Sequence, residues 1–470
     1  MDKDNSIVKL EDFFDFNSQE PINRLAYTEA DLEYKVKVIK KMQELGMKIT
    51  IDKAGNICGT IALGENPTKT IAIGSHTDSV YNGGQYDGPV GVISALQTAE
   101  KIIERKNCNG ILKVAIYACE ESSRFGNACV GSKFLNKKLS EDDFEKYFDK
   151  KAKEERGEII TLKSEIEKAR KYLKENVEGI EEVERIFEEV DYSLEAHIEQ
   201  YQSLDKKAKK TGKPTIGIID SVGSAFRLQY TVKGEPNHSG STPMKKRRNP
   251  ADTVGYIGLK VWKLGKRWEK QGLGRASQLI IGTIDDQGSL NQIAPGARGA
   301  IDFRLIGENT SENALDEFKR IKEKAEKKFK TEVTEETISK GLPAITSKKL
   351  NSKIADICEK LNINYHIMAS YPGQDTGYIP ARKKTMIFIP STEGSHNPKE
   401  STTRASIEDA TQIFINLTED LLKQKEMDKY KVNQDYFYKK DKDNKTKQQN
   451  EDKKKEQKKK TKVKDIGEGR

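Results

Sequence analysis

Short apolar runs bounded by glycine, proline and polar residues recur along the chain. Three of them, at residues 70–74, 111–118 and 385–390, have the length and composition of buried strands. Between the first two, residues 89–106 carry apolar positions at helical spacing, and Pro89 suits the first turn of a helix. A strand, a helix and a strand in this order predict a βαβ unit with a parallel sheet, and therefore an α/β protein.

The middle of the chain follows other patterns. Residues 137–190 are mostly charged with sparse apolar positions at helical spacing, which predicts exposed amphipathic helices that carry no chemistry. From about residue 214 the pattern becomes β-rich, and residues 214–234 predict a hairpin. Two helices and two strands are predicted after it, in 250–269, 311–329, 278–286 and 296–307. These elements predict a small α+β domain inserted into the α/β domain.

The α/β pattern returns after about residue 335, with a predicted helix in 350–362 before the strand at 385–390. The chain is therefore divided into four predicted parts. They are the first part of the α/β domain (1–212), the inserted domain (213–334), the second part of the α/β domain (335–426) and a basic tail (427–470).

Most of the net charge belongs to the tail. Residues 429–470 contain 16 Lys and Arg against 8 Asp and Glu, a balance of +8, and the whole chain of 470 residues carries +9. The body is thus close to neutral, and the tail is expected to be disordered. Lysine runs bind phosphate without sequence preference, but basic and aromatic residues interleave here only in YFYKKDKDNK. Specific nucleic-acid binding is not expected.

Cysteine usage and hydropathy bear on the compartment. The five cysteines form no CxxC pair, which argues against a disulfide framework and fits a reducing cytosol. The N-terminal residues lack the pattern of a signal peptide. The chain also lacks the run of about 18 apolar residues that a membrane span needs. A cytoplasmic protein that does not bind membranes is expected.

Histidine is scarce, with five in the whole chain, yet several lie beside carboxylates directly after strand-like runs. In an open α/β sheet, ligands bind at the carboxyl ends of the strands, so these segments are expected to converge. They supply His76, Asp78, Asp87, Glu120, Glu121, His197 and His396. Imidazole with carboxylate favours zinc over manganese or cobalt, both of which such ligands also bind. One carboxylate bridging two ions would give a dinuclear site with a shared water of lowered pKa.

These motifs resemble the hydantoinase/carbamoylase branch of the M20 family of dinuclear-metal aminoacylases and peptidases. The resemblance covers roughly residues 15–425 and rests on HTDSVYNGGQYDGPVGV, EESSRFGNACVGS, AHIEQ, NHSGSTPM and GSHNPKE. It implies a zinc-aminopeptidase-like catalytic domain of mixed sheet with an inserted ferredoxin-like lid and dimerisation domain. It also implies a homodimer that hydrolyses an amino-acid-like substrate of the N-carbamoyl, allantoate or ureidopropionate type by a metal-bridged hydroxide.

The resemblance implies a role for each metal-site residue. Asp87 bridges the two divalent ions. His76 and His197 complete the shell of one ion, and Glu121 and His396 complete that of the other. A cis peptide bond is implied after Asp87.

Further residues are implied to act on the substrate or to support the ligands. Glu120 is implied as the general base, and Asp78 is implied to orient the His76 ring. In the inserted domain, His238 is implied to stabilise the oxyanion on domain closure, or across a dimer interface. The other implied substrate contacts are Asn291 and Arg304, which hold an α-carboxylate, and Gln200.

Two positions depart from the branch. Tyr201 follows HIEQ where the branch reads HIEQGP, and Gln374 replaces the histidine of its GAGHDA motif. Asp375, next to Gln374, is retained and is expected to support the site without binding an ion. His366 matches no motif and is expected to be structural. Hydrolysis is still expected despite these departures, but they leave the identity of the substrate undetermined.

Three alternatives stay open. The same site would serve an aminoacylase or a dipeptidase. From a different class, the chain would be a non-catalytic, metal-stabilised binding protein, or its lysine tail would make it a polyanion binder.

Overall fold

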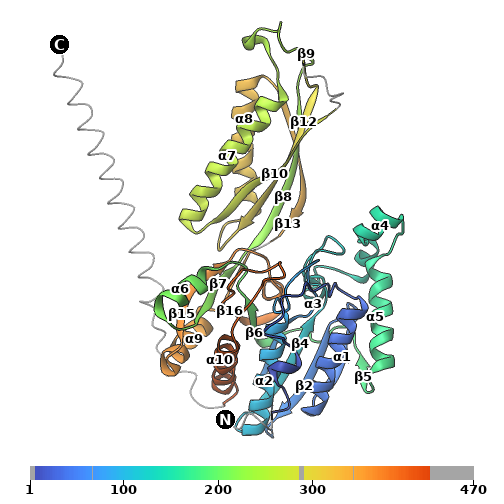
Figure 1. The fold of residues 1–470 in the computed structure, drawn as a ribbon, viewed down its shortest axis with the longest axis vertical. Coiled ribbons are helices and arrows are strands. Elements are labelled where there is room, and N and C mark those ends of the chain that lie inside the picture. Colours follow the sequence, from blue (N-terminus) through green and yellow to red (C-terminus); the bar gives the residue numbers. More distant parts are fainter. Residues whose placement is uncertain (1–5, 66, 285–290, 342, 424–470) are drawn as a thin grey trace, which may run out of the picture. The chain divides into compact units, whose positions relative to one another are not determined.

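The computed structural model describes residues 6–65, 67–284, 291–341 and 343–423 (Figure 1). It contains a ten-stranded sheet in the order β14-β7-β16-β6-β3-β4-β2-β1-β5, with β15 also pairing with β7. Its strands are β1 (Lys48–Ile51), β2 (Ile57–Leu63), β3 (Thr70–His76), β4 (Gly110–Tyr117), β5 (Ile180–Glu182), β6 (Val190–Ile198), β7 (Thr215–Val222), β14 (Ala344–Ile345), β15 (Asn364–Ser370) and β16 (Ala381–Ile389). The predicted α/β class is confirmed.

The centre of this sheet is parallel. Strand β3 pairs in parallel with β4 and β6, and β6 pairs in parallel with β16. Each is an apolar run whose residues are buried on both faces, which is what a parallel sheet covered by helices requires. Because the four strands point the same way, their carboxyl ends share one edge of the sheet.

Several helices belong to the same part of the fold as the large sheet. They are α1 (Glu29–Glu44), α2 (Pro89–Arg105), α3 (Val130–Leu135), α4 (Lys150–Arg156), α5 (Leu162–Asn176), α6 (Ser203–Thr211), α9 (Lys348–Leu361) and α10 (Arg404–Leu422). Helix α2 packs on β3 and β6 and against α10, which also contacts α9 and β16. Apolar residues of α2 and α10 are fully buried in the main core, among them Val92, Leu96, Ile413 and Phe414. No helix in the described ranges is long and apolar enough to cross a membrane.

The charged segment 137–190 is only partly the exposed surface that was expected. It does form helices, α4 and α5, but α5 buries Leu162, Ile166 and Leu173 in the main core. The segment also adds strand β5 to the sheet beside β1. Its sparse apolar residues lie on one helix face, as their helical spacing indicated, and that face is buried in the main core.

An arginine ties this segment to the chain that follows β4. Arg124 is buried, and its guanidinium donates to Asp149 Oδ2 at 2.9 Å and to Glu165 Oε2 at 2.6 Å. A third nitrogen donates to the carbonyl of Ala26 at 2.7 Å. Planar guanidinium geometry suits such a set of acceptors, and burial makes the loss of one partner costly.

The hairpin predicted for residues 214–234 is wrong. Strand β7 belongs to the large sheet, whereas β8 (Ser224–Lys233) belongs to a second sheet. Gly223 joins them, and a Cβ there would lie 2.3 Å from the carbonyl oxygen of Tyr371. Two apolar strands separated by glycine can form a hairpin, or the chain can cross there from one sheet to another. Here the chain crosses between sheets, and Gly223 allows its close approach to the backbone of Tyr371.

The second sheet is antiparallel, in the order β10-β12-β8-β13. Chain order is β8, α7 (Pro250–Gln271), β10 (Gly274–Ile284), β12 (Gly296–Leu305), α8 (Ser311–Phe329) and β13 (Glu332–Lys340). This βαββαβ order is ferredoxin-like, and the two helices pack together over a separate core (Figure 1). A short pair, β9 (Asn237–His238) with β11 (Gln292–Ile293), accompanies it. The domain limits stay predictions, and the predicted tail lies outside the described residues.

Candidate metal centre

Four neighbouring strands deliver the predicted ligands to one edge of the large sheet. His76 is the last residue of β3, and His197 is the next-to-last residue of β6. Glu121 follows the end of β4, and His396 lies in the loop after β16. Asp87 lies in the turn before α2. The parallel arrangement thus brings together residues that are far apart in the sequence.

The side chains form two groups that share one aspartate. His76, Asp87 and His197 make the first, and Asp87, Glu121 and His396 make the second. Within each group the candidate ligand atoms all lie within 4.8 Å of one another. Each oxygen of Asp87 faces a different histidine. Oδ1 lies 3.1 Å from His197 Nε2, and Oδ2 lies 3.2 Å from His396 Nε2.

The hydrogen bonds of the two buried histidines indicate which nitrogen faces the centre. His76 Nδ1 lies 2.9 Å from the carbonyl oxygen of Asp78, and His197 Nδ1 lies 2.9 Å from that of Ile198. A carbonyl only accepts, so both Nδ1 atoms carry the proton, and in the neutral rings Nε2 presents a lone pair. The two Nε2 atoms lie 3.2 Å apart. Two lone pairs facing each other beside a carboxylate fit a cation placed between them.

The charges agree with a cation site. Burial lowers the pKa of His76 to about 3, which keeps its ring neutral as a metal ligand must be. Burial alone would raise the pKa of Asp87, but His197 and His396 outweigh it and lower that pKa. Burial would lower the pKa of His396, but hydrogen bonds to Asp87 and Glu121 raise it to about 11. Carboxylates that attract a proton this strongly would also attract a divalent cation.

Glu120 lies beside the second group without being part of it. It is buried, and Cys129 Sγ donates to its Oε1 at 3.2 Å. Burial, with a further contribution from the neighbouring charge of Glu121, raises the pKa of Glu120 well above its usual range. The Asp78 carboxylate accepts from the backbone amides of Glu120 and Glu121, at 3.2 and 3.0 Å. Asp78 therefore holds the acidic pair with its side chain and the His76 ring with its carbonyl.

Gln200 and Asp375 lie in different surroundings. Gln200 Nε2 donates to Asp87 Oδ1 at 3.3 Å, so it touches the shared aspartate. Asp375 is fully buried and accepts from Ser132 Oγ at 2.5 Å. Within the described residues its other oxygen has no hydrogen-bond partner, and neither does Gln374 Oε1, the amide oxygen of the residue that departs from the family motif.

The three residues predicted in the inserted domain do not lie together. His238 is in β9, directly opposite Gln292, and Ser239 donates its backbone amide to the carbonyl of Asn291 at 2.7 Å. His238 and Asn291 are therefore neighbours. Arg304, next to the last residue of β12, donates through Nε to Asp302 Oδ2 at 2.7 Å. This ion pair is the strand-surface contact that such an arginine commonly makes.

The cis peptide bond expected after Asp87 is wrong, because no described peptide bond is cis. The turn is instead made by Gly88, with φ of +85° and ψ of −57°. A Cβ at Gly88 would lie 2.5 Å from the His76 ring. The absence of a side chain allows both the left-handed conformation and the approach to the ligand.

Two further residues contact the shared aspartate and were missed by the sequence predictions. Ser395 Oγ donates to Asp87 Oδ2, and Glu400 accepts from the backbone amide of Asp87 at 2.9 Å. Both belong to the GSHNPKE motif that supplied His396. In the sequence they stand out only as polar residues in a glycine-containing loop beside a candidate ligand. That feature does not distinguish a side chain that contacts Asp87 from one that points into solvent.

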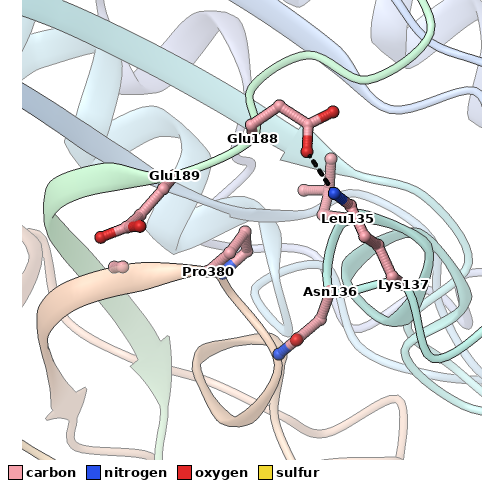
Figure 2. A pocket seen from close by; sticks show the side chains of 7 residues that line it. Leu135, Asn136, Lys137, Glu188, Glu189 and Pro380 are labelled. Carbon is pink, nitrogen blue, oxygen red and sulfur yellow. Dashed lines mark ion pairs between the residues drawn. The ribbon is translucent and has the colours of Figure 1, made fainter.

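A shallow pocket at the other edge of the sheet is a separate feature. Figure 2 shows the residues around it, which include Lys137, Glu188, Glu189 and Pro380. Two of them, Glu189 and Pro380, directly precede β6 and β16, whereas the candidate ligands lie at the carboxyl ends of those strands. Lys137 Nζ pairs with Glu188 Oε2 at 2.9 Å across the pocket. The pocket lining shares no residue with the metal groups.

Comparisons with known proteins find similar amidohydrolases. The chain is 26% identical over 412 residues to an allantoate amidohydrolase of Bacillus subtilis, covering 84% of this chain and 92% of that one. It is 27% identical over 394 residues to an N-carbamoyl-L-amino-acid amidohydrolase of a Pseudomonas species, covering 81% and 88%. The structure of a hydantoinase/carbamoylase family amidase from Burkholderia multivorans shares the fold, with a TM-score of 0.72 at 21% identity over 89% and 97% of the chains.

The family model for peptidase family M20/M25/M40 matches residues 72–420, which is well over half of the chain. The match spans every residue of the two metal groups, from His76 to His396. The resemblance stated from the motifs is thereby confirmed, and the chain belongs to peptidase family M20/M25/M40.

Proposed function

We propose that the chain is a metal-dependent amidohydrolase that cleaves a linear carbon–nitrogen bond of an N-substituted amino acid. One observation carries this proposal: Asp87 presents each of its oxygens to a different histidine, and the two Nε2 atoms of His76 and His197 face each other at 3.2 Å. Two divalent ions fit these donors. His76 and His197 would complete the shell of one, and Glu121 and His396 that of the other. Zinc is the proposed metal, with manganese and cobalt as alternatives.

The proposed substrate is an α-ureido carboxylate. The names of the two relatives, an allantoate amidohydrolase and an N-carbamoyl-L-amino-acid amidohydrolase, both denote a ureido group attached to the carbon that carries a carboxylate. Arg304 and Asn291 are the proposed contacts of the carboxylate, and His238 is proposed to stabilise the oxyanion. An aminoacylase or dipeptidase activity at the same site is the alternative.

Glu120 is the proposed general base and acid. When bound, the ions would polarise the substrate carbonyl and lower the pKa of a water molecule. The Glu120 carboxylate takes a proton from the attacking water as the water oxygen bonds to the carbonyl carbon. Glu120 then gives this proton to the departing nitrogen as the C–N bond breaks. Two hydrogen bonds support the position of Glu120. Cys129 Sγ donates to its carboxylate, and its own backbone amide donates to Asp78. Hydrolysis of the carbamoyl group yields ammonia, carbon dioxide and an amino acid.

A substrate panel tests the reaction. The full chain, reconstituted with zinc or manganese, is expected to release ammonia from N-carbamoyl-L-amino acids or from allantoate, and to act far less on N-acetyl-amino acids and dipeptides. Ammonia is measured by a coupled assay and free amino acid by amine detection. Amine release from acetylated or dipeptide substrates without ammonia would replace the ureido proposal with the aminoacylase alternative. Inactivity on the whole panel would contradict both.

We propose in addition that the chain acts as a homodimer through the inserted domain. Helix α7 exposes Leu259 and Trp262, about one turn apart, at 50% and 55% of their surface. Exposed large apolar side chains on one helix face favour burial against a partner. Because Arg304 does not lie beside His238 and Asn291, these residues would reach a single substrate more readily from two different subunits.

Replacing Trp262 with glutamate is expected to shift the protein toward monomers, because a charge would have to be buried in the proposed interface. Light scattering measures the mass, and kcat is expected to fall with dissociation if His238 acts across the interface. Ile159→Glu is the matched control, since Ile159 is 72% exposed and lies outside the inserted domain. A wild-type chain that is monomeric at all concentrations tested would contradict the dimer.

A further inference from the structure

Glu400 is a buried acid that belongs to neither metal group. It is 2% exposed, and its contacts are with backbone amides and a hydroxyl. Its Oε1 accepts from the backbone amides of Tyr86 and Asp87, at 2.8 and 2.9 Å. Its Oε2 lies 2.7 Å from Ser395 Oγ, whose single proton can bond this oxygen in place of Asp87 Oδ2. Burying a carboxylate is costly, so the two amides and the nearby hydroxyl stabilise a side chain whose solvation has been lost.

The contacts of Glu400 connect two of the loops that supply candidate ligands, those of Asp87 and His396. Tyr86 and Asp87 lie in the loop before α2, and Ser395 directly precedes His396 in the loop after β16. These loops are far apart in the sequence and follow different strands of the sheet. One carboxylate therefore fixes the spacing between the shared aspartate and a histidine of the second metal group.

Ser395 closes this connection into a ring. Its Oγ contacts Glu400 Oε2 on one side and Asp87 Oδ2 on the other. Asp87 is thus held twice, at its backbone amide by Glu400 and at its carboxylate by Ser395. The Asp87 oxygen that Ser395 contacts is the one that faces His396.

The loop leaves no room for this carboxylate to move. A Cβ at Gly84 would lie 2.4 Å from Cβ and from Oε1 of Glu400, so the glycine and the glutamate are fitted to each other. Ile22 and Gly83 form an isolated bridge that fixes the other side of the same loop.

We propose that Glu400 and Ser395 are positioning residues, which hold Asp87 and His396 at the separation that binding of both ions requires. Groups that orient metal ligands typically change metal affinity by about 10–100-fold when they are removed. The proposal rests on the proposed function only in taking the two groups as a metal centre. It concerns metal binding by the chain and needs no substrate.

Cobalt provides the test, because its visible absorption reports the ligand geometry. Co²⁺ is titrated into the metal-free full chain in competition with a chelator, for the wild type and for Glu400→Gln. We expect the variant to lose about 10–100-fold in affinity for at least one Co²⁺ and to show an altered absorption spectrum. Glutamine has a similar shape, but it carries no charge and replaces one of the two acceptor oxygens with an NH2 donor.

Glu100→Gln is the matched control. Glu100 is also 2% exposed and accepts from a serine hydroxyl, Ser6 Oγ at 2.8 Å, and from a backbone amide, Ile7 at 2.6 Å, but it touches no metal ligand. Thermal unfolding of the metal-free proteins should show comparable destabilisation of both variants. Of these two variants, Glu400→Gln alone should change the cobalt affinity and the absorption spectrum.

Two further variants keep the test decisive if Glu400→Gln fails to fold. Ser395→Ala removes one hydroxyl, and Gly84→Ala pushes a methyl group against Glu400. Both are expected to weaken cobalt binding in the same direction. Wild-type affinity and absorption in the folded variants would overturn the proposal, and so would an equal loss in Glu100→Gln. A wild type that binds two Co²⁺ but hydrolyses no substrate would refute the proposed function and leave this proposal standing.

Discussion

Replacing Asp87 with asparagine is expected to abolish hydrolysis and to release at least one of the two metal ions. An amide offers one neutral oxygen, whereas the carboxylate presents an oxygen to each histidine, His197 and His396. Stabilisation by bound metal is worth several kcal/mol, so activity should fall by about 10³-fold or more. Metal content by mass spectrometry and kcat on the preferred ureido substrate measure the two effects.

The matched control is Asp409→Asn, the same chemical change at a half-buried position on helix α10. This variant should keep its metal and its activity. Retention of both ions by Asp87→Asn, at wild-type affinity, would show that the two groups do not share this aspartate as a ligand.

Replacing Glu120 with glutamine is expected to lower kcat by about 10²-fold or more while the metal content stays unchanged. The amide cannot accept the proton of the attacking water, yet it keeps the size of the side chain and belongs to neither ligand group. Parallel measurement of bound metal and of turnover separates this result from that of Asp87→Asn.

Glu100→Gln again serves as the control for loss of a buried glutamate. Unchanged turnover in Glu120→Gln would exclude Glu120 as the base and would favour a non-catalytic, metal-stabilised protein. Loss of metal from Glu120→Gln would instead make this residue a ligand.

Local patterns predicted the elements near the centre well. Helix 89–106 and the strands at 70–74 and 111–118 match α2, β3 and β4 closely, because each is a buried run between turn residues. The passage from β7 to β8 could not be predicted in the same way. Whether two adjacent strands pair with each other depends on partners far along the chain, here β16 for one and β12 for the other.

The candidate ligands were predicted because histidine is rare and each one followed a strand. The supporting residues were not, because Ser395 and Glu400 have the composition of any polar loop, and only tertiary structure shows that they meet Asp87. The cis bond after Asp87 was expected from the resemblance alone, and the turn is made instead by Gly88 at positive φ.

The buried ion pairs of Arg124 have a consequence for the charged segment 137–190. Its partners Asp149 and Glu165 come from the charged segment, while Arg124 itself lies shortly beyond Glu121 in the sequence. Deletion of that segment would leave the buried guanidinium without either carboxylate, which is a costly change. The two helices of the segment therefore stabilise the chain just after β4, and the segment is more than a surface addition.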